Sequence, residues 1–401
     1  MKDIADPVVW IYQGIDEYIA DITVDLLGSI YTNGSVEVAK INNLGVKVWR
    51  LDAYAFPDRP DLTAGGVMGR YITAGNDGYI YTTHDGHGEN GTPAVRQISD
   101  GGSPIWLLTD TGGTRGLAFK NGYLYVTYDN SLPPNFISIR KLNSNSTNVW
   151  SLTDVANGLA VDVDSLNNVY VVHSDYDTNL ISGKALVRKL DSYGVEQWRI
   201  AHLGDPRSVA VDPIDDSIYV AYHNAVGLTN VQKLNSAGVQ QWALTDIGQA
   251  LAVKVDHLGF VYVIYDNPLG TVNIRKLTKD GVQVWALSDT VAPIAIAINS
   301  SNDIFVLCSW YSPDYMHAYS AIRKINGSAP TGGGRTYNDG FILGMQVGDM
   351  ASAANMSIVI PEVGPVPPTG PAGPADDKDA FQAGFLQGFA ILGMTGNRGS
   401  T

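Results

Sequence analysis

Short stretches in which apolar and polar residues alternate recur along this chain up to about residue 327. A period of two is typical of strands that bury one face. In the segment "NGLAVDVDSLNNVYVVHSDYDTNLISGKALVRKLDSYGVEQWRI" (157–200), four such stretches follow one another and are bounded by Asn, Asp, Gly or Ser. These residues favour turns, so we predict a unit of four short strands, which we name A to D in chain order.

This unit repeats, and its clearest marker is a Trp on strand D, as in "GVQQWALTD" (238–246) and "GVQVWALSD" (281–289). A period of roughly 40 to 50 residues is the signature of propellers and solenoids. The motif tryptophans are Trp49, Trp106, Trp150, Trp198, Trp242 and Trp285. Strand B carries an aromatic residue at one register, namely Tyr31, Tyr81, Tyr125, Tyr170, Tyr219, Tyr262 and Phe305. We predict that both sets pack in the core and do not form a ligand-stacking ladder.

The N-terminal stretch "DPVVWIYQG" has the pattern of a strand D, although no unit precedes it. The last unit, by contrast, stops after strand C, where "APTGGG" replaces the expected Trp strand. We therefore predict that residues 7–13 pair with strand C of the last unit, around residues 319–326, which leaves no open sheet edge. The fold class is then all-β, a seven-bladed β-propeller over residues 1–327 that is closed by the N-terminal strand.

The units resemble those of the quinoprotein-like and seven-bladed β-propeller repeat families, in which a turn Gly precedes the Trp and the pattern "VD..GN.YV" follows. The resemblance covers about residues 7–327 and implies a ring of blades. It does not imply a quinone cofactor, because the export signal and the vicinal cysteine pair of many quinoprotein dehydrogenases are missing. Propellers carry unrelated functions, so the resemblance assigns none, and we predict no cofactor.

From Ala329 the blade pattern ends, and residues 328–401 form a Gly/Pro-rich tail. The segments "YNDGFILGMQVGDM" (337–350) and "FQAGFLQGFAILGM" (381–394) align with each other. We expect two short helices whose glycine stripes need close packing against something else. The predicted docking residues are Tyr337, Gly340, Phe341, Gly344, Phe381, Gly384, Phe385 and Gly388. Folding back onto the propeller and membrane association are the alternatives to partner docking.

Between these segments lies "PEVGPVPPTGPAGPADD", which has too few Gly-x-y triplets for a collagen helix and predicts an extended spacer. Runs of this kind resemble those of bacteriophage tail-fibre and other virion proteins. That resemblance implies a location on a virion, with other assembly proteins as partners of the tail. Oligomerisation through the tail is a further possibility.

Composition narrows the functional classes. The formal net charge of -14 disfavours nucleic acid and anionic membranes as partners. Cys308 is the only cysteine, so neither a disulfide nor a Cys-rich metal site is expected. The N-terminus lacks the pattern of a secretory signal, and no run of 18 apolar residues predicts a membrane span.

The long B-to-C loops share one face of the predicted ring, which makes that face the candidate binding face. Its residues are His84, Asp85, His87, Tyr128, Asp129, His173, Asp175, Tyr265, Asp266, Trp310 and Tyr311. Aromatics beside carboxylates can bind sugars, but the same residues also cap strand ends in ordinary turns. His84 and His87 with Glu89 match no established metal-ligand spacing, so no metal site is predicted.

Two charged patterns have structural explanations. "DVDSLNN" (162–168) lacks the Gly and Glu of a calcium loop and fits the A-to-B turn of the fourth blade. The strand-C arginines lie on different blades, so we expect them to meet local carboxylates and not to form a phosphate-binding stripe. These arginines are Arg96, Arg140, Arg188, Arg275 and Arg323.

No Gly-x-Ser-x-Gly motif is present, and Cys308 lies in the apolar run "DIFVLCSW", so we predict no catalytic residues. The leading hypothesis is a non-enzymatic structural and interaction protein, a bacteriophage virion component that is anchored by its tail. The alternative is a carbohydrate-binding or carbohydrate-hydrolysing propeller that acts on host surface glycans.

Overall fold

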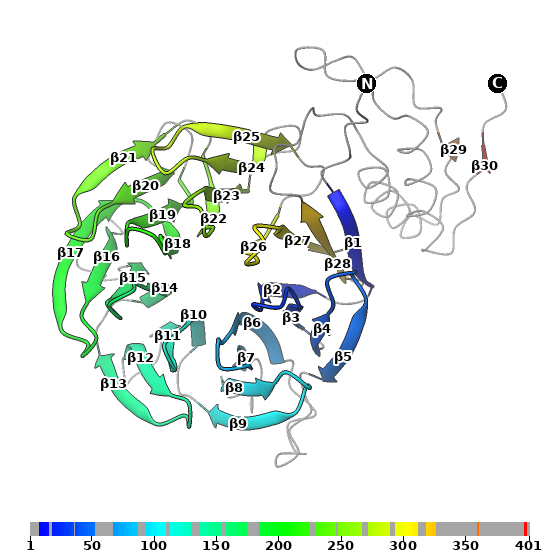
Figure 1. Cartoon of the computed structure of the whole chain (residues 1–401), viewed down its shortest axis with the longest axis horizontal. Coiled ribbons are helices and arrows are strands. Elements are labelled where there is room, and N and C mark those ends of the chain that lie inside the picture. Colours follow the sequence, from blue (N-terminus) through cyan, green and yellow to red (C-terminus); the bar gives the residue numbers. More distant parts are fainter. Residues whose placement is uncertain are drawn as a thin grey trace.

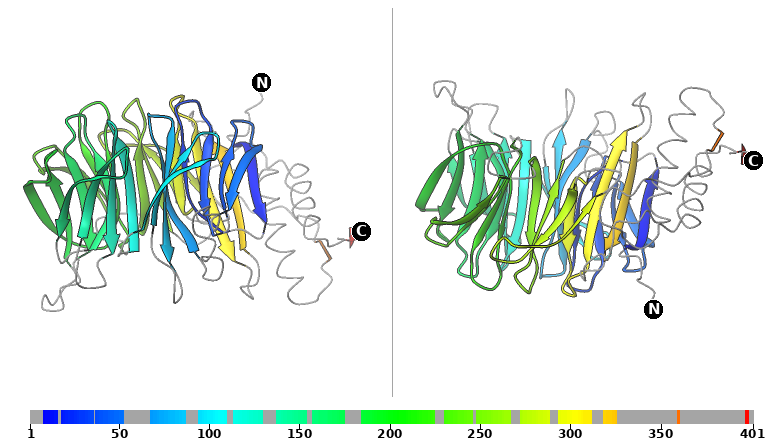
Figure 2. Two further views of the ribbon diagram at one scale, coloured as in Figure 1. Left: turned by 90° about the horizontal axis from the view of Figure 1, so that it is seen from below. Right: turned by 90° about the horizontal axis from the view of Figure 1, so that it is seen from above.

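In a computed structural model, the described strands form seven four-stranded antiparallel sheets, which are arranged as a ring around a central channel (Figure 1). The described residues are 8–15, 18–35, 37–52, 67–86, 94–109, 113–129, 137–153, 157–174, 184–224, 230–245, 248–266, 272–288, 293–311, 318–325, 359–360 and 397–398. The side views show strands that run from one face of the ring to the other (Figure 2). The predicted all-β seven-bladed propeller is confirmed.

Strand A of each blade lines the channel, and strand D forms the outer edge (Figure 1). Blades one and two comprise β2 (Ile19–Val24), β3 (Ile30–Gly34), β4 (Glu37–Ile41), β5 (Lys47–Asp52), β6 (Val67–Ala74), β7 (Tyr79–Gly86), β8 (Ala94–Ser99) and β9 (Pro104–Thr109). Blades three and four comprise β10 (Gly113–Lys120), β11 (Tyr123–Asp129), β12 (Ile137–Asn143), β13 (Asn148–Thr153), β14 (Asn157–Val163), β15 (Val169–Ser174), β16 (Lys184–Leu190) and β17 (Glu196–Leu203). Blades five and six comprise β18 (Pro206–Val211), β19 (Ile218–Tyr222), β20 (Val231–Leu234), β21 (Gln240–Leu244), β22 (Ala250–Val255), β23 (Val261–Tyr265), β24 (Val272–Leu277) and β25 (Gln283–Ser288).

The seventh blade joins the two ends of the repeat region. It comprises β26 (Ala295–Ile298), β27 (Ile304–Tyr311), β28 (Ala318–Ile325) and β1 (Val8–Ile15). Strand β1 pairs antiparallel with β28 and occupies the place of strand D (Figure 1). The predicted closure by the N-terminal strand is therefore confirmed, and β28 has a strand partner on its outer side, as strand C has in the other blades.

The strand-B aromatics are buried between blades, as predicted from the sequence. In each of blades one to six, the strand-B Tyr lies against the strand-D Trp of its own blade, with ring centroids 5.8 to 6.3 Å apart. Trp198 also donates a hydrogen bond from Nε1 to the carbonyl of Ser236 in the C-to-D turn of the next blade, at 3.1 Å. Trp49, Trp106, Trp150 and Trp242 make the same bond to Asp100, Ser144, Ser192 and Lys279. Each of these five tryptophans therefore links two blades.

A turn glycine precedes five of the six Trp motifs of blades one to six, and Ser146, with φ of +60°, takes this place before Trp150. Gly238 has φ of +80°, and a Cβ at this position would lie 3.0 Å from the ring of Trp198. Gly194 has φ of +85° and lies equally close to Trp150. Glycine adopts this left-handed conformation without strain and permits the close approach, so the C-to-D turn of one blade packs against the Trp of the blade before it.

A carboxylate in the A-to-B turn holds the strand-B hydroxyl in several blades. Tyr170 donates to Asp164 at 3.0 Å, and Tyr262 donates to Asp256 at the same distance. The other oxygen of Asp164 accepts the backbone N–H groups of Leu166 and Asn168, as in an Asx turn. The segment "DVDSLNN" is thus the A-to-B turn that the sequence predicted, with its carboxylate bound within the protein.

The cationic side chains of strand C interact with other groups of the propeller. Arg188 is buried and pairs with Glu196 at 3.1 Å, and Lys324 pairs with Asp303 at 2.8 Å. Other strand-C lysines lie near the Tyr rings and donate to the turn carbonyls of the next blade, as Lys189 does to Ser236. Some of these charges thus meet local carboxylates as predicted, whereas others meet backbone carbonyls.

The tail contributes one described element, a parallel pair of β29 (Val359–Ile360) and β30 (Asn397–Arg398). Both predicted docking segments, 337–350 and 381–394, lie outside the described residues. Within the described part of the chain, no helix has the length and apolarity needed to cross a membrane.

Candidate binding site in the central channel

Several candidates on the loop face are core residues. The side chains of His84, Tyr128, His173 and Tyr265 are buried at the ends of their strands. The guanidinium of Arg140 lies 5.6 Å from the Tyr128 ring centroid. Burial and the nearby Arg96 hold the pKa of His84 well below its usual range, so this imidazole is neutral at pH 7. A ligand role for these four residues would require them to become exposed.

The remaining candidates on this face are less fully described. Asp85, Asp129, Trp310 and Tyr311 lie in β7, β11 and β27, and their side chains are not among those described. His87, Asp175 and the eight tail residues from Tyr337 to Gly388 lie outside the described residues. Their predicted roles stay predictions.

Asp266 belongs to a charged cluster between blades five and six. Its carboxylate lies 3.8 Å from Nε2 of His223, whose Nδ1 lies 4.0 Å from Asp205. Asp205 in turn pairs with Arg207 at 2.6 Å. Within the described part of the chain, no group of three or more His, Cys, Asp or Glu residues could hold a metal ion.

The sequence did not reveal a cavity of about 460 Å³ in the central channel, which is lined by the A strands of all seven blades. A β-bulge interrupts strand A in each of blades one to six. A bulge adds a residue and redirects side chains, so a residue that strict alternation would bury faces the channel. Each bulge, and the equivalent position before β26, contributes one residue to the lining of the cavity. We call this set the bulge column; its members are Ala20, Arg70, Arg115, Leu159, Arg207, Leu251 and Ile294.

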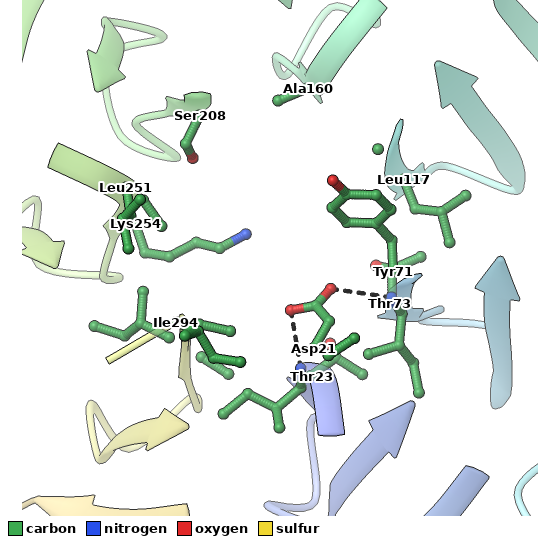
Figure 3. Close-up of a pocket in the computed structure, with 18 of the residues that line it drawn as sticks. Asp21, Thr23, Tyr71, Thr73, Leu117, Ala160, Ser208, Leu251, Lys254 and Ile294 are labelled. Atoms are coloured by element: carbon green, nitrogen blue, oxygen red, sulfur yellow. Dashed lines mark hydrogen bonds between the residues drawn. The ribbon is translucent and has the colours of Figure 1, made fainter. Parts of the chain in front are cut away.

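Farther along the strands, polar side chains join neighbouring A strands to one another. Asp21 accepts the backbone N–H of Ile22 at 2.9 Å and that of Ile72, on the next blade, at 3.1 Å (Figure 3). Asp162 makes the equivalent bonds to Val163 and to Val211 on the next blade, both at 2.8 Å. Both carboxylates thus connect adjacent blades.

Burial raises the pKa of Asp21 to about 6 and also raises that of Asp162, although their backbone hydrogen bonds and Lys254 act in the opposite direction. Lys254 and Tyr71 reach into the cavity from different sides (Figure 3). The channel therefore contains cationic side chains and hydroxyl groups. It also contains the carboxylates of Asp21 and Asp162, which accept hydrogen bonds from the backbone. This arrangement suits the binding of a ligand better than acid–base catalysis, because the carboxylates have fixed hydrogen-bond partners.

The sequence carried a signal for this site, which is the set of arginines at equivalent strand-A positions. Arg115 is followed by "GLAF", and Arg207 by "SVAV", in the same place within each unit. Repeat comparison of strand A, in addition to strands B, C and D, would have found this column. The bulges would still have hidden which way it faces.

Comparison with solved structures finds the same architecture in distant proteins. One chain from a crystal structure of the mitotic checkpoint complex matches with a TM-score of 0.59 and 9% identity, over 81% of this chain and 94% of that one. The Pan2 WD40 domain of Neurospora crassa matches with a TM-score of 0.53 and 10% identity, over 76% and 89% of the two chains. No protein-family model and no curated protein sequence matches the chain. At such low identity, the likeness establishes the WD40-like propeller fold and nothing about ligands or partners.

Proposed function

We propose that this chain is a non-catalytic protein-interaction module and, more specifically, a component of a bacteriophage virion that its tail attaches to the particle. The propeller then serves as a rigid body that presents a docking surface to another protein of the same particle. One observation carries the proposal. Large apolar side chains are exposed at the end of the ring that bears the tight turns.

These side chains, which we name the turn belt, lie in the A-to-B turns, in the C-to-D turns and at the starts of the D strands. Leu27, Leu44 and Leu166 are 86%, 74% and 73% exposed. The members are Leu26, Leu27, Leu44, Val46, Val48, Ile105, Val149, Leu166, Tyr193, Val195, Ile214, Val239, Leu258, Val282 and Val284. Large apolar side chains exposed together at one end of a molecule are a mark of protein interaction sites.

The turn belt extends over several blades because equivalent turns of the repeat carry exposed apolar residues. Turn positions are normally polar, because Asn, Asp, Gly and Ser satisfy the local backbone. Several turns contain both a capping carboxylate or amide and an apolar residue beside it. In one of them Asp256 accepts the backbone N–H groups of Leu258 and Phe260, and Leu258 is the exposed apolar residue. The turns therefore need the carboxylate for their own geometry, whereas the apolar tips contribute nothing to it.

Sedimentation of an extract from the source organism tests the proposal, with an antibody against the propeller as the probe. The chain should sediment with assembled particles, and a chain ending at residue 327 should stay in the slow fraction. Recovery of the full chain only as a free protein would contradict a place on a particle. Turnover of host surface glycans by the purified protein would contradict the non-catalytic assignment.

A second experiment addresses the turn belt itself. Changing Leu27, Leu44, Leu166 and Leu258 to Ser should reduce incorporation into particles by at least about tenfold and leave the melting temperature within roughly 2 °C, since exposed positions contribute little to stability. The matched control changes the exposed polar turn residues Asn43, His257 and Lys279 to Ala. Equal incorporation of both variants would exclude the turn belt as the docking surface.

A further inference from the structure

The turn belt is most regular on three consecutive blades. In each of blades four to six, a Leu or Ile lies two positions after the Asp that caps the A-to-B turn. A Val lies four positions after the residue that caps the C-to-D turn of the same blade. These six side chains are between 58% and 73% exposed. We call this set the three-blade arc; its members are Leu166, Val195, Ile214, Val239, Leu258 and Val282.

The other blades interrupt this pattern. Blade one has Leu27 and Val46 at the two positions, but the equivalent residues of its neighbours are Asp77 and Ser103 in blade two and Ser301 in blade seven. Strand A lies next to the channel and strand D outermost, so the A-to-B residues of the arc lie nearer the channel than the C-to-D residues (Figure 1). The three-blade arc therefore forms two rows of exposed aliphatic side chains.

The chain leaves the propeller at the same face. Ile325, the last residue of β28, pairs with Ile304, the first residue of β27, and β27 follows the A-to-B turn of blade seven. The end of β28 therefore lies at the turn end of the ring. Residues 326–380, which connect β28 to the tail segment 381–394, span at most roughly 180 Å when fully extended. This length is enough for the segment to reach a neighbouring copy.

Charge favours segment 381–394 over segment 337–350 as the occupant of the arc. The formal net charge of -14 makes copies of the chain repel one another. Asp215 and Asp280 are exposed in the turns of the arc. Segment 337–350 contains two Asp residues, whereas segment 381–394 has three Phe and no charged residue. The uncharged segment therefore approaches the arc without electrostatic repulsion.

We propose that the three-blade arc of one copy binds segment 381–394 from the tail of a second copy, with the Phe side chains of the segment packed between the two rows. The arc is exposed in the single chain, so its occupant comes from another molecule. Each copy has one arc and one such segment, so the contact is heterologous and links copies head to tail. The inference rests on the proposed function, in which the turn belt is a docking surface, and names the partner for one part of that belt.

A fluorescent peptide of residues 381–394 tests the contact, and the full-length Phe385→Ala chain is the receptor because its own segment is impaired. Fluorescence anisotropy should show saturable binding with a Kd below about 100 µM. The same peptide with Phe385→Ala should bind at least about tenfold more weakly. Absence of saturable binding up to about 1 mM would overturn the proposal.

Receptor variants locate the site. Changing Leu166, Ile214 and Leu258 to Ser removes one row of the arc and should weaken peptide binding by at least about tenfold. The matched control makes the same change at three exposed apolar residues of blades one to three, which are Leu44, Ile105 and Val149. The control should change the affinity by less than about twofold. Equal losses in the two variants would overturn the arc as the binding site.

Mixing two defective chains shows whether the contact links copies. The Phe385→Ala chain keeps its arc, and the chain with Ser in the arc keeps its tail. Sedimentation velocity should find each variant monomeric alone and a dimer in their mixture, whereas the natural chain should form larger, concentration-dependent species. A mixture that stays monomeric would overturn the link between copies.

These outcomes are separable from the outcome for the proposed function. Failure of the peptide to bind, with incorporation into particles still dependent on the turn belt, would contradict this inference alone. Peptide binding without any incorporation of the chain into particles would contradict the proposed function alone.

Discussion

Trp10 of β1 lies opposite Lys324 of β28, which is the same pairing that Trp198 makes with Lys189 and Trp242 makes with Lys233. The ladder in each case also contains a register shift beside the Trp. The N-terminal strand therefore occupies the seventh blade in the register of an ordinary strand D. Closure of the ring reproduces the geometry of the continuous blades.

Removing this strand should destabilise the ring. Deletion of residues 1–13 takes away most of β1 and leaves β28 with unpaired backbone groups, so we expect aggregation or a fall in melting temperature of roughly 10 °C or more. Deletion of residues 1–6, which precede β1, is the control and should have little effect. An identical melting curve for both deletions would show that β1 does not hold the ring closed.

The contribution of the Trp hydrogen bond between blades to stability can be measured with a matched pair of variants. Trp198→Phe removes the bond from Nε1 to Ser236 and should lower the free energy of unfolding by roughly 1 to 3 kcal/mol, including the loss of ring contacts. Trp285 is buried, but within the described part of the chain its Nε1 has no acceptor. Trp285→Phe should therefore cost less than Trp198→Phe.

Chemical denaturation of both variants is the measurement. Trp198 and Trp285 have similar contacts with their strand-B tyrosines, at 6.0 and 6.1 Å, but Trp285 is the more deeply buried of the two. Loss of ring contacts therefore opposes the expected order, so a smaller cost for Trp285→Phe would point to the hydrogen bond. An equal cost would indicate that Trp285 finds an acceptor outside the described residues.

The hydrogen bond between the strand-B Tyr and the turn Asp can be tested with a second pair of variants. Tyr262→Phe removes a hydroxyl that donates to Asp256, and we expect a loss of about 1 kcal/mol or more. The buried hydroxyl of Tyr125 has no acceptor within the described part, because its blade has the short turn Asn121–Gly122 in place of an Asp turn. Tyr125→Phe should therefore be neutral or stabilising. Equal losses, measured by urea denaturation, would contradict the role of the turn carboxylate.

Stability should depend on pH through the channel carboxylates. The pKa of Asp21 is about 6 in the folded chain, against an ordinary value of 3.8, so the folded state binds more protons between these values. The free energy of unfolding must then fall as pH rises through this window, by roughly 1 to 3 kcal/mol from Asp21. Asp21→Asn removes this titration, so its cost relative to the natural chain should be larger at pH 4 than at pH 7.

Two further variants control for other titrating groups. Asp162→Asn should behave like Asp21→Asn, because burial also raises the pKa of Asp162. Asp100→Asn should show the opposite trend, since Lys40 and Tyr31 lower the pKa of Asp100 and its contribution to stability is lost as pH falls below about 4. Parallel pH profiles for all three variants would contradict this account.

Much of the architecture could be predicted from the sequence because it depends on local patterns. Alternation defined the strands, the spacing of Trp and Tyr defined the blades, and the displaced "DPVVWIYQG" motif defined the closure. Burial of the strand-B aromatics followed as well, since a large apolar side chain at one register of every blade must pack against its neighbours.

The candidate site could not be predicted in the same way. His84, Tyr128 and Tyr265 looked like loop-face residues because each precedes a long loop, yet they lie deep enough in the blade to be buried. The channel wall combines residues from seven segments spread over nearly 300 positions, and bulges in strand A alter which side chains face inward. The sequence by itself determined the repeat and its core, because neighbours in the chain interact within one blade. It also determined the closure, because the N-terminal strand carries the Trp pattern that the last unit lacks. Only the tertiary structure decided that Arg70, Arg115 and Leu251 face one cavity, because that depends on how the blades pack round the ring.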